Sequence, residues 1–273
     1  MVSGTTSRSA CSFVNRSNFL IAKRTYADFS NGLYKVTELQ PGLVLIKNGL
    51  PIAEQIKLTE IALKHGENPD TGFWRIDQLG QKVLNQAPRA PHRGRIYDAL
   101  GKYPPILTEL CQKNLVRAAQ FDSSIKPIDA THFILLYYQT LAEPPNSGYI
   151  PWHQDKDPND GDDDQPVVSF TIGDSCDFLV CNGRPQISST HPRSNPVNLA
   201  HRILFESGDV LIFGGPSRTI YHSIYEMHND TAPKSLPLRD ARLNFTFRFT
   251  PHILGKEEEF NSKNFVSVYH KGT

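Results

Sequence analysis

The run Arg242-Leu-Asn-Phe-Thr-Phe-Arg248 constrains the fold of this chain more than any other segment. Successive side chains of a β-strand point to opposite faces. One face of this strand would therefore carry Arg242, Asn244, Thr246 and Arg248, and the other Leu243, Phe245, Phe247 and Phe249. A polar row bounded by two arginines and backed by an apolar face is unusual for a strand exposed to solvent. The pattern favours the inner wall of a barrel that holds a small dianion.

Short strands dominate the chain from residue 131 onward. We predict them at 133–138, 167–172, 177–181, 202–206, 210–213, 219–225 and 243–249, with turn signals at 207–209 and 214–216. This density indicates a sandwich, a jelly roll or a barrel rather than a parallel α/β sheet. An immunoglobulin-like sandwich is disfavoured because no Cys-Trp-Cys arrangement accompanies the strands.

The N-terminal half predicts two helices. One spans 51–65, with Pro51 at its start, apolar Ile52, Ile56 and Leu63, and Gly66 as a stop. The other spans 105–119, with Leu107, Leu110, Cys111 and Leu115 inward. Residues 43–46 resemble a short strand, and 73–95 resemble irregular chain rich in Gln, Pro, Arg and aromatic residues. The fold class is therefore mainly β with flanking helices, α+β.

Composition limits the partners and the compartment. No apolar run approaches the roughly 20 residues of a membrane span, and a net charge of +1 gives no global attraction to nucleic acid. A polyanion would have to meet a local patch. The cysteines at 11, 111, 176 and 181 form no close Cys-x-x-Cys pair, which favours reduced thiols inside the cell.

The first 27 residues lack acidic side chains and contain Arg8, Arg16, Lys23 and Arg24. This pattern suits a mitochondrial or chloroplast transit peptide. It suits equally an unstructured basic tail on a nuclear or cytoplasmic protein, and both interpretations stay open.

A set of potential metal ligands lies upstream of the arginine row. His153 and Asp155, two residues apart, would lie on the same side of an extended segment, and His222 lies on a later strand. Two histidines and one carboxylate form the facial triad that binds non-haem Fe(II) and leaves positions open for an organic acid and O₂. A single His-x-Asp is weak evidence, since His228-Asn-Asp230 repeats the motif in a polar segment that we assign to a solvated turn.

The two arginines suggest the organic acid. A guanidinium matches a carboxylate bidentately, so we expect Arg242 to bind the distal carboxylate of 2-oxoglutarate, with Arg248 nearer the metal. The alternative is that both arginines pair with internal acids such as Asp209 or Glu206.

Together these segments resemble the AlkB family of Fe(II)/2-oxoglutarate-dependent dioxygenases over about residues 131–250. The resemblance is carried by His153-Gln-Asp-Lys-Asp157, Pro166-Val-Val-Ser-Phe-Thr-Ile-Gly173, Glu206-Ser-Gly-Asp-Val-Leu-Ile-Phe-Gly-Gly215, Ser217-Arg218, Tyr221-His222 and the arginine row. The tract Thr231-Ala-Pro-Lys-Ser-Leu236 is similar to plant members. The resemblance implies a double-stranded β-helix (jelly roll) core at 131–255 and a nucleotide-recognition lid region at 31–130. Tails at 1–30 and 256–273 would flank these regions.

The resemblance also implies residue roles. His153, Asp155 and His222 would bind iron, and Arg242, Asn244, Arg248 and Tyr138 would contact 2-oxoglutarate. Asp157 matches the family acid that contacts the substrate base. Leu136 stands where members usually carry Asn, which removes one polar contact to the co-substrate.

The implied reaction is the oxidative demethylation of N-methylated bases in DNA or RNA by a monomer, with release of formaldehyde, succinate and CO₂. An extruded base needs an aromatic clamp. Trp74 and Tyr97 are candidates, although for either one packing in the core is the favoured interpretation. Arg184 and the cluster Arg89, His92, Arg93 and Arg95 could contact phosphate, or be solvated surface charge. Two alternatives remain: an oxygenase acting on protein or a small molecule, and a non-catalytic jelly-roll binding module.

Overall fold

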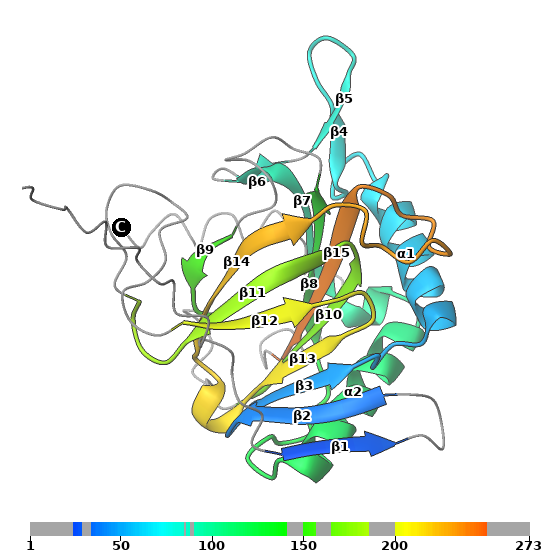
Figure 1. Ribbon diagram of the computed structural model, residues 1–273. Helices are drawn as coiled ribbons and strands as arrows, with labels where there is room; N and C mark the ends of the chain where they lie inside the picture. The colour runs from blue at the N-terminus through cyan, green and yellow to red at the C-terminus, as the bar shows by residue number, and fades with distance from the viewer. Residues whose placement is uncertain are drawn as a thin grey trace, which may run out of the picture.

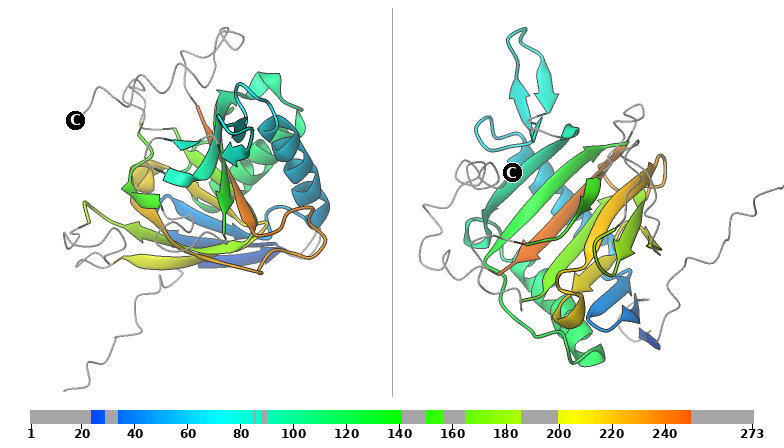
Figure 2. Two further views of the ribbon diagram at one scale, coloured as in Figure 1. Left: turned by 90° about the horizontal axis from the view of Figure 1, so that it is seen from above. Right: turned by 90° about the vertical axis from the view of Figure 1, so that its left-hand side faces the viewer.

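The computed structural model describes residues 24–28, 34–84, 86–87, 90–140, 150–156, 165–185 and 200–249. The described chain forms three layers, with two helices on one face of a large sheet and a small sheet on the other (Figures 1 and 2). Neither helix is long and apolar enough to cross a membrane.

The large sheet has nine strands, and every strand pairing in it is antiparallel. Their order is β1 (Arg24–Asp28), β2 (Tyr34–Gln40), β3 (Leu43–Lys47), β13 (Val210–Phe213), β10 (Val167–Gly173), β15 (Ala241–Arg248), β8 (His132–Gln139), β7 (Ala90–Ala99) and β6 (Gln86–Ala87). β15 therefore lies inside the sheet, between β10 and β8.

The small sheet has four antiparallel strands, in the order β12 (His201–Phe205), β11 (Ser175–Cys181), β14 (Tyr221–His228) and β9 (Ile150–His153). A separate hairpin of β4 (Trp74–Ile76) and β5 (Lys82–Leu84) projects from the body (Figure 1). Short 3-10 turns occur at η1 (Leu100–Lys102) and η2 (Gly215–Ser217). The two facing antiparallel sheets agree with the expected jelly roll.

The helices are α1 (Ile52–Gly66) and α2 (Ile106–Phe121), close to the predicted spans. In α2 the predicted inward residues Leu107, Leu110, Cys111 and Leu115 are all buried. In α1 the buried stripe is Gln55, Leu58, Thr59, Ala62 and Gly66. Ile52 is the first residue of the helix and is 42% exposed. Ile56 and Leu63 are half-buried at the edges of the stripe.

Two apolar cores sandwich the large sheet. The first lies between the sheet and the helices, and the second lies between the two sheets. The alternation along β15 follows this division, because Leu243, Phe245 and Phe247 belong to the helix-side core. The polar row Arg242, Asn244, Thr246 and Arg248 instead lines a cavity between the sheets. The inner-wall prediction for this strand is confirmed.

All seven predicted strands of the C-terminal half overlap observed strands, but the N-terminal half contains more sheet than predicted. Residues 73–95 contain β4, β5, β6 and the first part of β7, where irregular chain was expected. Residues 24–28, expected to belong to a tail, pair with β2. β2 and β9 were also missed. Residues 1–23, 141–149, 157–164, 186–199 and 250–273 lie outside the described residues, and so do the expectations placed there.

Candidate metal and co-substrate site

His153 and His222 come from neighbouring strands of the small sheet. β9 pairs with β14 in a register that sets them directly opposite each other, with ring centroids 4.2 Å apart. Each Nδ1 lies against the carbonyl two residues earlier, at 2.8 Å from Pro151 for His153 and 3.1 Å from Ile220 for His222. A backbone carbonyl is an acceptor, so it fixes the proton on Nδ1. Both Nε2 lone pairs are then available to a metal.

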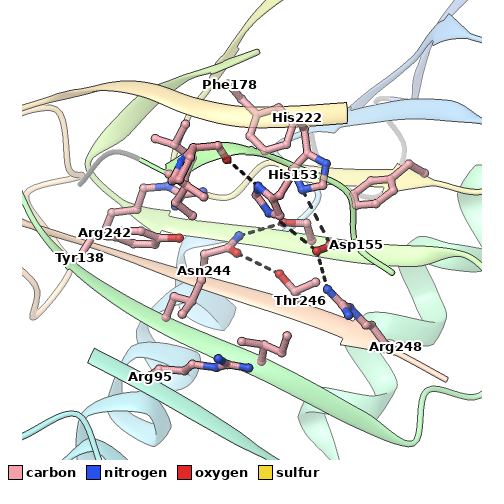
Figure 3. Close-up of a pocket in the computed structure, with 17 residues that line it drawn as sticks. Arg95, Tyr138, His153, Asp155, Phe178, His222, Arg242, Asn244, Thr246 and Arg248 are labelled. Atoms are coloured by element: carbon pink, nitrogen blue, oxygen red, sulfur yellow. Dashed lines mark hydrogen bonds and ion pairs between the residues drawn. The ribbon is translucent and has the colours of Figure 1, made fainter. Parts of the chain in front are cut away.

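Asp155 completes the group. Its two carboxylate oxygens lie 3.9 Å from Nε2 of His153 and 3.9 Å from Nε2 of His222. The three potential ligand atoms all lie within 4.8 Å of one another, so one ion could bridge them. Figure 3 shows the three side chains converging at one wall of the cavity. Two imidazoles and one carboxylate on one side of an ion suit Fe(II) with open positions.

The protonation states suit metal binding, which requires neutral imidazole and ionised carboxylate. Burial alone would raise the pKa of Asp155, but Arg248 and then the two histidines outweigh it and lower that pKa to about 2. Burial, and after it the neighbouring His153, lowers the pKa of His222 to about 4, although Asp155 acts in the opposite direction. Near neutral pH, Asp155 is therefore ionised and His222 is uncharged.

Arg218 fixes the backbone that carries these ligands. Its side chain is buried, and it donates from Nη1 to the carbonyl of Asp155 at 2.5 Å and from Nε to the carbonyl of Gln165. Arg218 follows η2 and precedes β14, the strand that carries His222. The guanidinium of Arg218 thus connects the turn that precedes β14 to the backbone at Asp155 and at Gln165.

The cavity between the sheets has a volume of about 260 Å³. Asn244, Thr246 and the two arginines of β15 form one wall, and the three potential metal ligands contribute to the opposite side. Most of the other lining side chains are apolar, namely Ile134, Leu136, Ile150, Pro151, Phe178, Phe213 and Ile224, and Arg95, Tyr138 and Ser169 complete the lining. The potential metal ligands and the arginine row therefore face the same cavity.

Arg242 is the most unusual side chain of this wall. It is 0% exposed, and its Nε donates to Thr171 Oγ1 at 2.8 Å. Neither of its terminal nitrogens has a hydrogen-bond partner in the part of the chain that the structure describes. The guanidinium is held beside the rings of Tyr138 and Phe205, at 5.2 and 5.6 Å from their centroids. A buried cation with two unsatisfied donors is costly without an anion, so this pocket fits a carboxylate.

Asn244 lines the cavity but is already engaged within the wall. Its Nδ2 donates to Ser169 Oγ and to the carbonyl of Phe170, both at 2.8 Å, and its Oδ1 accepts from Thr246 Oγ1 at 3.0 Å. The two bonds donated by Asn244 join β15 to β10. Both amide hydrogens are used by the wall, so a further donor to a bound acid must come from another residue.

Arg248 forms an ion pair with Asp155, through Nη2 and Oδ1 (Figure 3). The alternative partners considered for the arginines, Asp209 and Glu206, instead both pair with Lys47. Arg248 thus pairs with an internal acid, as that alternative proposed, although with neither of the two acids named, and Arg242 has no acid partner among the described residues. Arg248 contacts the potential metal ligand Asp155, whereas Arg242 lies beside Tyr138. This agrees with the prediction that Arg248 lies nearer the metal than Arg242 does.

The residues predicted to recognise substrate are not brought together. Trp74 packs edge-on against Tyr137, with centroids 5.1 Å apart, and Tyr97 is 3% exposed beside His132. Neither lines the cavity, and both have packing contacts, in agreement with the packing interpretation. The role of either residue as an aromatic clamp stays a prediction. Arg184 is exposed beyond the end of β11 and does not line the cavity either. Asp157 lies outside the described residues.

Arg95 is a cavity residue that the sequence indicated only as part of a basic cluster. It lies on β7 opposite Leu136 of β8 and lines the cavity. Recognising β7 as a strand would have revealed that Arg95 faces inward together with Leu136. In the second His-x-Asp, Asp230 lies in the expected turn with a φ of 59°, but His228 is the last residue of β14 and lies 3.2 Å from the buried Asp177.

Comparison with known proteins agrees with this site. The family model of the 2OG-Fe(II) oxygenase superfamily matches residues 42–248. Two curated relatives from Arabidopsis thaliana are the DNA N(6)-methyladenine demethylases ALKBH1C and ALKBH1D. ALKBH1C is 30% identical over 257 residues, 86% of this chain and 54% of the relative. ALKBH1D is 28% identical over 258 residues, 85% of this chain and 54% of the relative.

A solved structure described as "The structure of OsALKBH1" superposes with a TM-score of 0.61 at 25% identity, covering 79% of this chain and 100% of that one. The fold and the site thus define a 2-oxoglutarate- and iron-dependent oxygenase. The chain belongs to the 2OG-Fe(II) oxygenase superfamily and, within it, to the AlkB family. It spans about half the length of the curated relatives that it matches.

Proposed function

We propose that this protein oxidatively demethylates N-methylated nucleobases in DNA or RNA. The observation that carries the proposal is the shared cavity of the His153, Asp155 and His222 group and the fully buried Arg242. One end is suited to a metal and the other to a carboxylate. An enzyme whose keto-acid co-substrate binds to its iron requires a metal site and a carboxylate site in one cavity.

The residue roles follow from these positions. His153, Asp155 and His222 hold the iron, and Arg242 binds the distal carboxylate of 2-oxoglutarate beside Tyr138. Arg248 neutralises Asp155 and borders the space for the keto-acid end. When bound, the iron and 2-oxoglutarate supply the activation of O₂ that oxidises the methyl carbon, with loss of CO₂ and succinate. The oxidised methyl group then leaves the base as formaldehyde.

The names of the relatives support a nucleic-acid substrate. ALKBH1C and ALKBH1D are named as demethylases of N(6)-methyladenine in DNA, so this base is the first to test. A base must leave the helix or come from a single strand to enter the cavity between the sheets. The described cysteines Cys111, Cys176 and Cys181 are buried and free, which supports a site of action inside the cell.

The test uses purified protein with Fe(II), 2-oxoglutarate, O₂ and a panel of singly methylated DNA and RNA oligonucleotides. We expect formaldehyde and unmodified base in equal amounts, dependent on 2-oxoglutarate. Asp155→Ala should be inactive, and His228→Ala, which alters the second His-x-Asp, should remain active. Succinate production without base repair would instead indicate an oxygenase for protein or small molecules. Complete absence of turnover would favour a binding module.

A further inference from the structure

Ser169 is a polar cavity residue to which the iron and co-substrate roles above assign nothing. It lies on β10, in register with Thr246 of β15, and it is 5% exposed. Its neighbours Val168 and Phe170 belong to the core between the large sheet and the helices. The alternation of a strand therefore turns Ser169 to the opposite face, where it lines the cavity together with the potential metal ligands.

A chain of hydrogen bonds along the wall ends at the Ser169 hydroxyl. Thr246 Oγ1 donates to Asn244 Oδ1 at 3.0 Å (Figure 3), and Asn244 Nδ2 donates to Ser169 Oγ at 2.8 Å. A serine hydroxyl accepts and donates at the same time. Ser169 Oγ accepts here, and no residue in the described part of the chain accepts its proton. That proton is available to an acceptor in the cavity.

The neighbouring hydroxyl groups are placed differently. Thr246 already donates its proton to Asn244. Thr171 is the next hydroxyl on the same face of β10, and it accepts from Arg242 Nε at 2.8 Å, but it does not line the cavity. Ser169 is thus the hydroxyl of β10 that a bound molecule can reach.

The position of Ser169 along the wall matches one end of the co-substrate. Arg242, which we assign to the distal carboxylate, is bonded to Thr171, and Ser169 lies two residues before Thr171 on β10. Two residues of a strand span roughly 7 Å, which is close to the length of a five-carbon diacid. Thr246, the register partner of Ser169, lies two residues from Arg248, the arginine at the metal ligands. Ser169 therefore lies on the metal side of the distal-carboxylate pocket.

We infer that the Ser169 hydroxyl binds the keto-acid end of 2-oxoglutarate by donating a hydrogen bond to it. The inference rests on the co-substrate role in the proposed function and adds a contact to that role. Asn244 then acts on 2-oxoglutarate through Ser169, because its two amide hydrogens are bonded to Ser169 and to the carbonyl of Phe170. The keto-acid end carries a carboxylate, and a hydrogen bond to a charged acceptor contributes more than a neutral one.

The test is a calorimetric titration of the Mn(II)-loaded full chain with 2-oxoglutarate, which requires neither turnover nor nucleic acid. Ser169→Ala should weaken 2-oxoglutarate binding by about tenfold or more, while the affinity for Mn(II) stays unchanged. Ser169→Thr keeps the hydroxyl on a residue that suits a strand, so it should retain most of the affinity.

Ser175→Ala is the matched control. Ser175 is also 5% exposed and its hydroxyl donates to Thr231 Oγ1 at 3.0 Å, but it does not line the cavity. This variant should bind 2-oxoglutarate like wild type.

Thr246→Val separates a direct contact from a disturbed wall. It removes the hydroxyl that donates to Asn244 and leaves that of Ser169 in place, so it should weaken 2-oxoglutarate binding less than Ser169→Ala does. Equal losses in these two variants, or in Ser169→Thr and Ser169→Ala, would overturn the inference. Wild-type affinity in Ser169→Ala, or a parallel fall in its Mn(II) affinity, would overturn it as well. A wild type that does not bind 2-oxoglutarate would instead remove the proposed function itself.

Discussion

His153 and His222 are direct cross-strand partners, set opposite each other by the register of β9 and β14. The sheet that forms the fold therefore also sets the distance between the two imidazoles. Each ring is oriented by a carbonyl of its own strand, two residues earlier. Two of the three potential ligands are consequently positioned by β-structure, and Arg218 bonds to the backbone of the third, Asp155.

Metal binding should depend on this group alone. We expect one Fe(II) or Mn(II) per chain in anaerobic calorimetric titration. His222→Ala should weaken binding by at least about 100-fold, beyond the effect typical for residues that only support a ligand. His228→Ala should bind like wild type because His228 pairs with Asp177 outside the site. Equal loss of affinity in both variants would contradict the assignment.

Arg242→Met should separate stability from co-substrate binding. Removing a buried cation with unsatisfied donors should raise the unfolding free energy of the ligand-free protein by about 1–4 kcal/mol. The KM for 2-oxoglutarate should rise by roughly 30-fold or more, because a buried charge pair contributes about 2 kcal/mol or more. Thermal unfolding with and without 2-oxoglutarate checks both effects. A variant that 2-oxoglutarate stabilises as strongly as wild type would refute the role of Arg242.

Leu136→Asn tests the departure from the family pattern. Leu136 lines the cavity directly opposite Asn244 in the β8 and β15 register, where it offers no hydrogen bond. An added amide donor worth about 1 kcal/mol should lower the KM for 2-oxoglutarate by about fivefold. Leu204→Asn, at an exposed position of β12, is the matched substitution and should have no effect. A higher KM in Leu136→Asn would show that this wall needs its apolar side chain.

The buried Asp209 predicts a pH dependence of stability. Burial raises its pKa from 3.8 to about 6, despite Lys47 and backbone N–H donors at Glu206 and Asn48 that act in the opposite direction. The folded state therefore favours the protonated acid more than the unfolded state does. The contribution of Asp209 to the free energy of unfolding is fully present below pH 3.8 and is lost as the pH rises through about 6.

The measurement is the unfolding free energy of wild type and Asp209→Asn in urea between pH 4 and pH 8. Relative to the variant, which cannot titrate, wild type should lose up to about 3 kcal/mol over this range. Other titrating groups affect both proteins alike and cancel in the difference. A difference that does not change with pH, or that changes in favour of wild type at high pH, would contradict the prediction.

The sequence predicted the parts of the molecule where local pattern and tertiary environment agree. β15 alternates strictly between polar and apolar residues, and each set is buried in a different environment, so its two faces could be assigned in advance. α2 was predicted for the same reason. The metal group was recognisable because its histidines lie on or at the ends of strands and its acid follows two residues later.

Other features depend on contacts between distant parts of the chain. β7 contains Pro91, Gly94 and charged residues, and it becomes a strand by pairing with β8. The inward position of Arg95 could not be predicted without that pairing. The partner of Arg248 is likewise set by the approach of β9 and β15, which no local pattern encodes. Trp74 and Tyr97 show that an aromatic residue does not reveal from sequence whether it packs or binds.

The bonds from Arg218 to Asp155 and Gln165 have an evolutionary consequence. Because one side chain bonds to the backbone at Asp155 and at Gln165, changes of sequence between these two residues need not displace the potential iron ligands. Relatives could therefore diversify this stretch to suit new substrates while inheriting the same reaction centre.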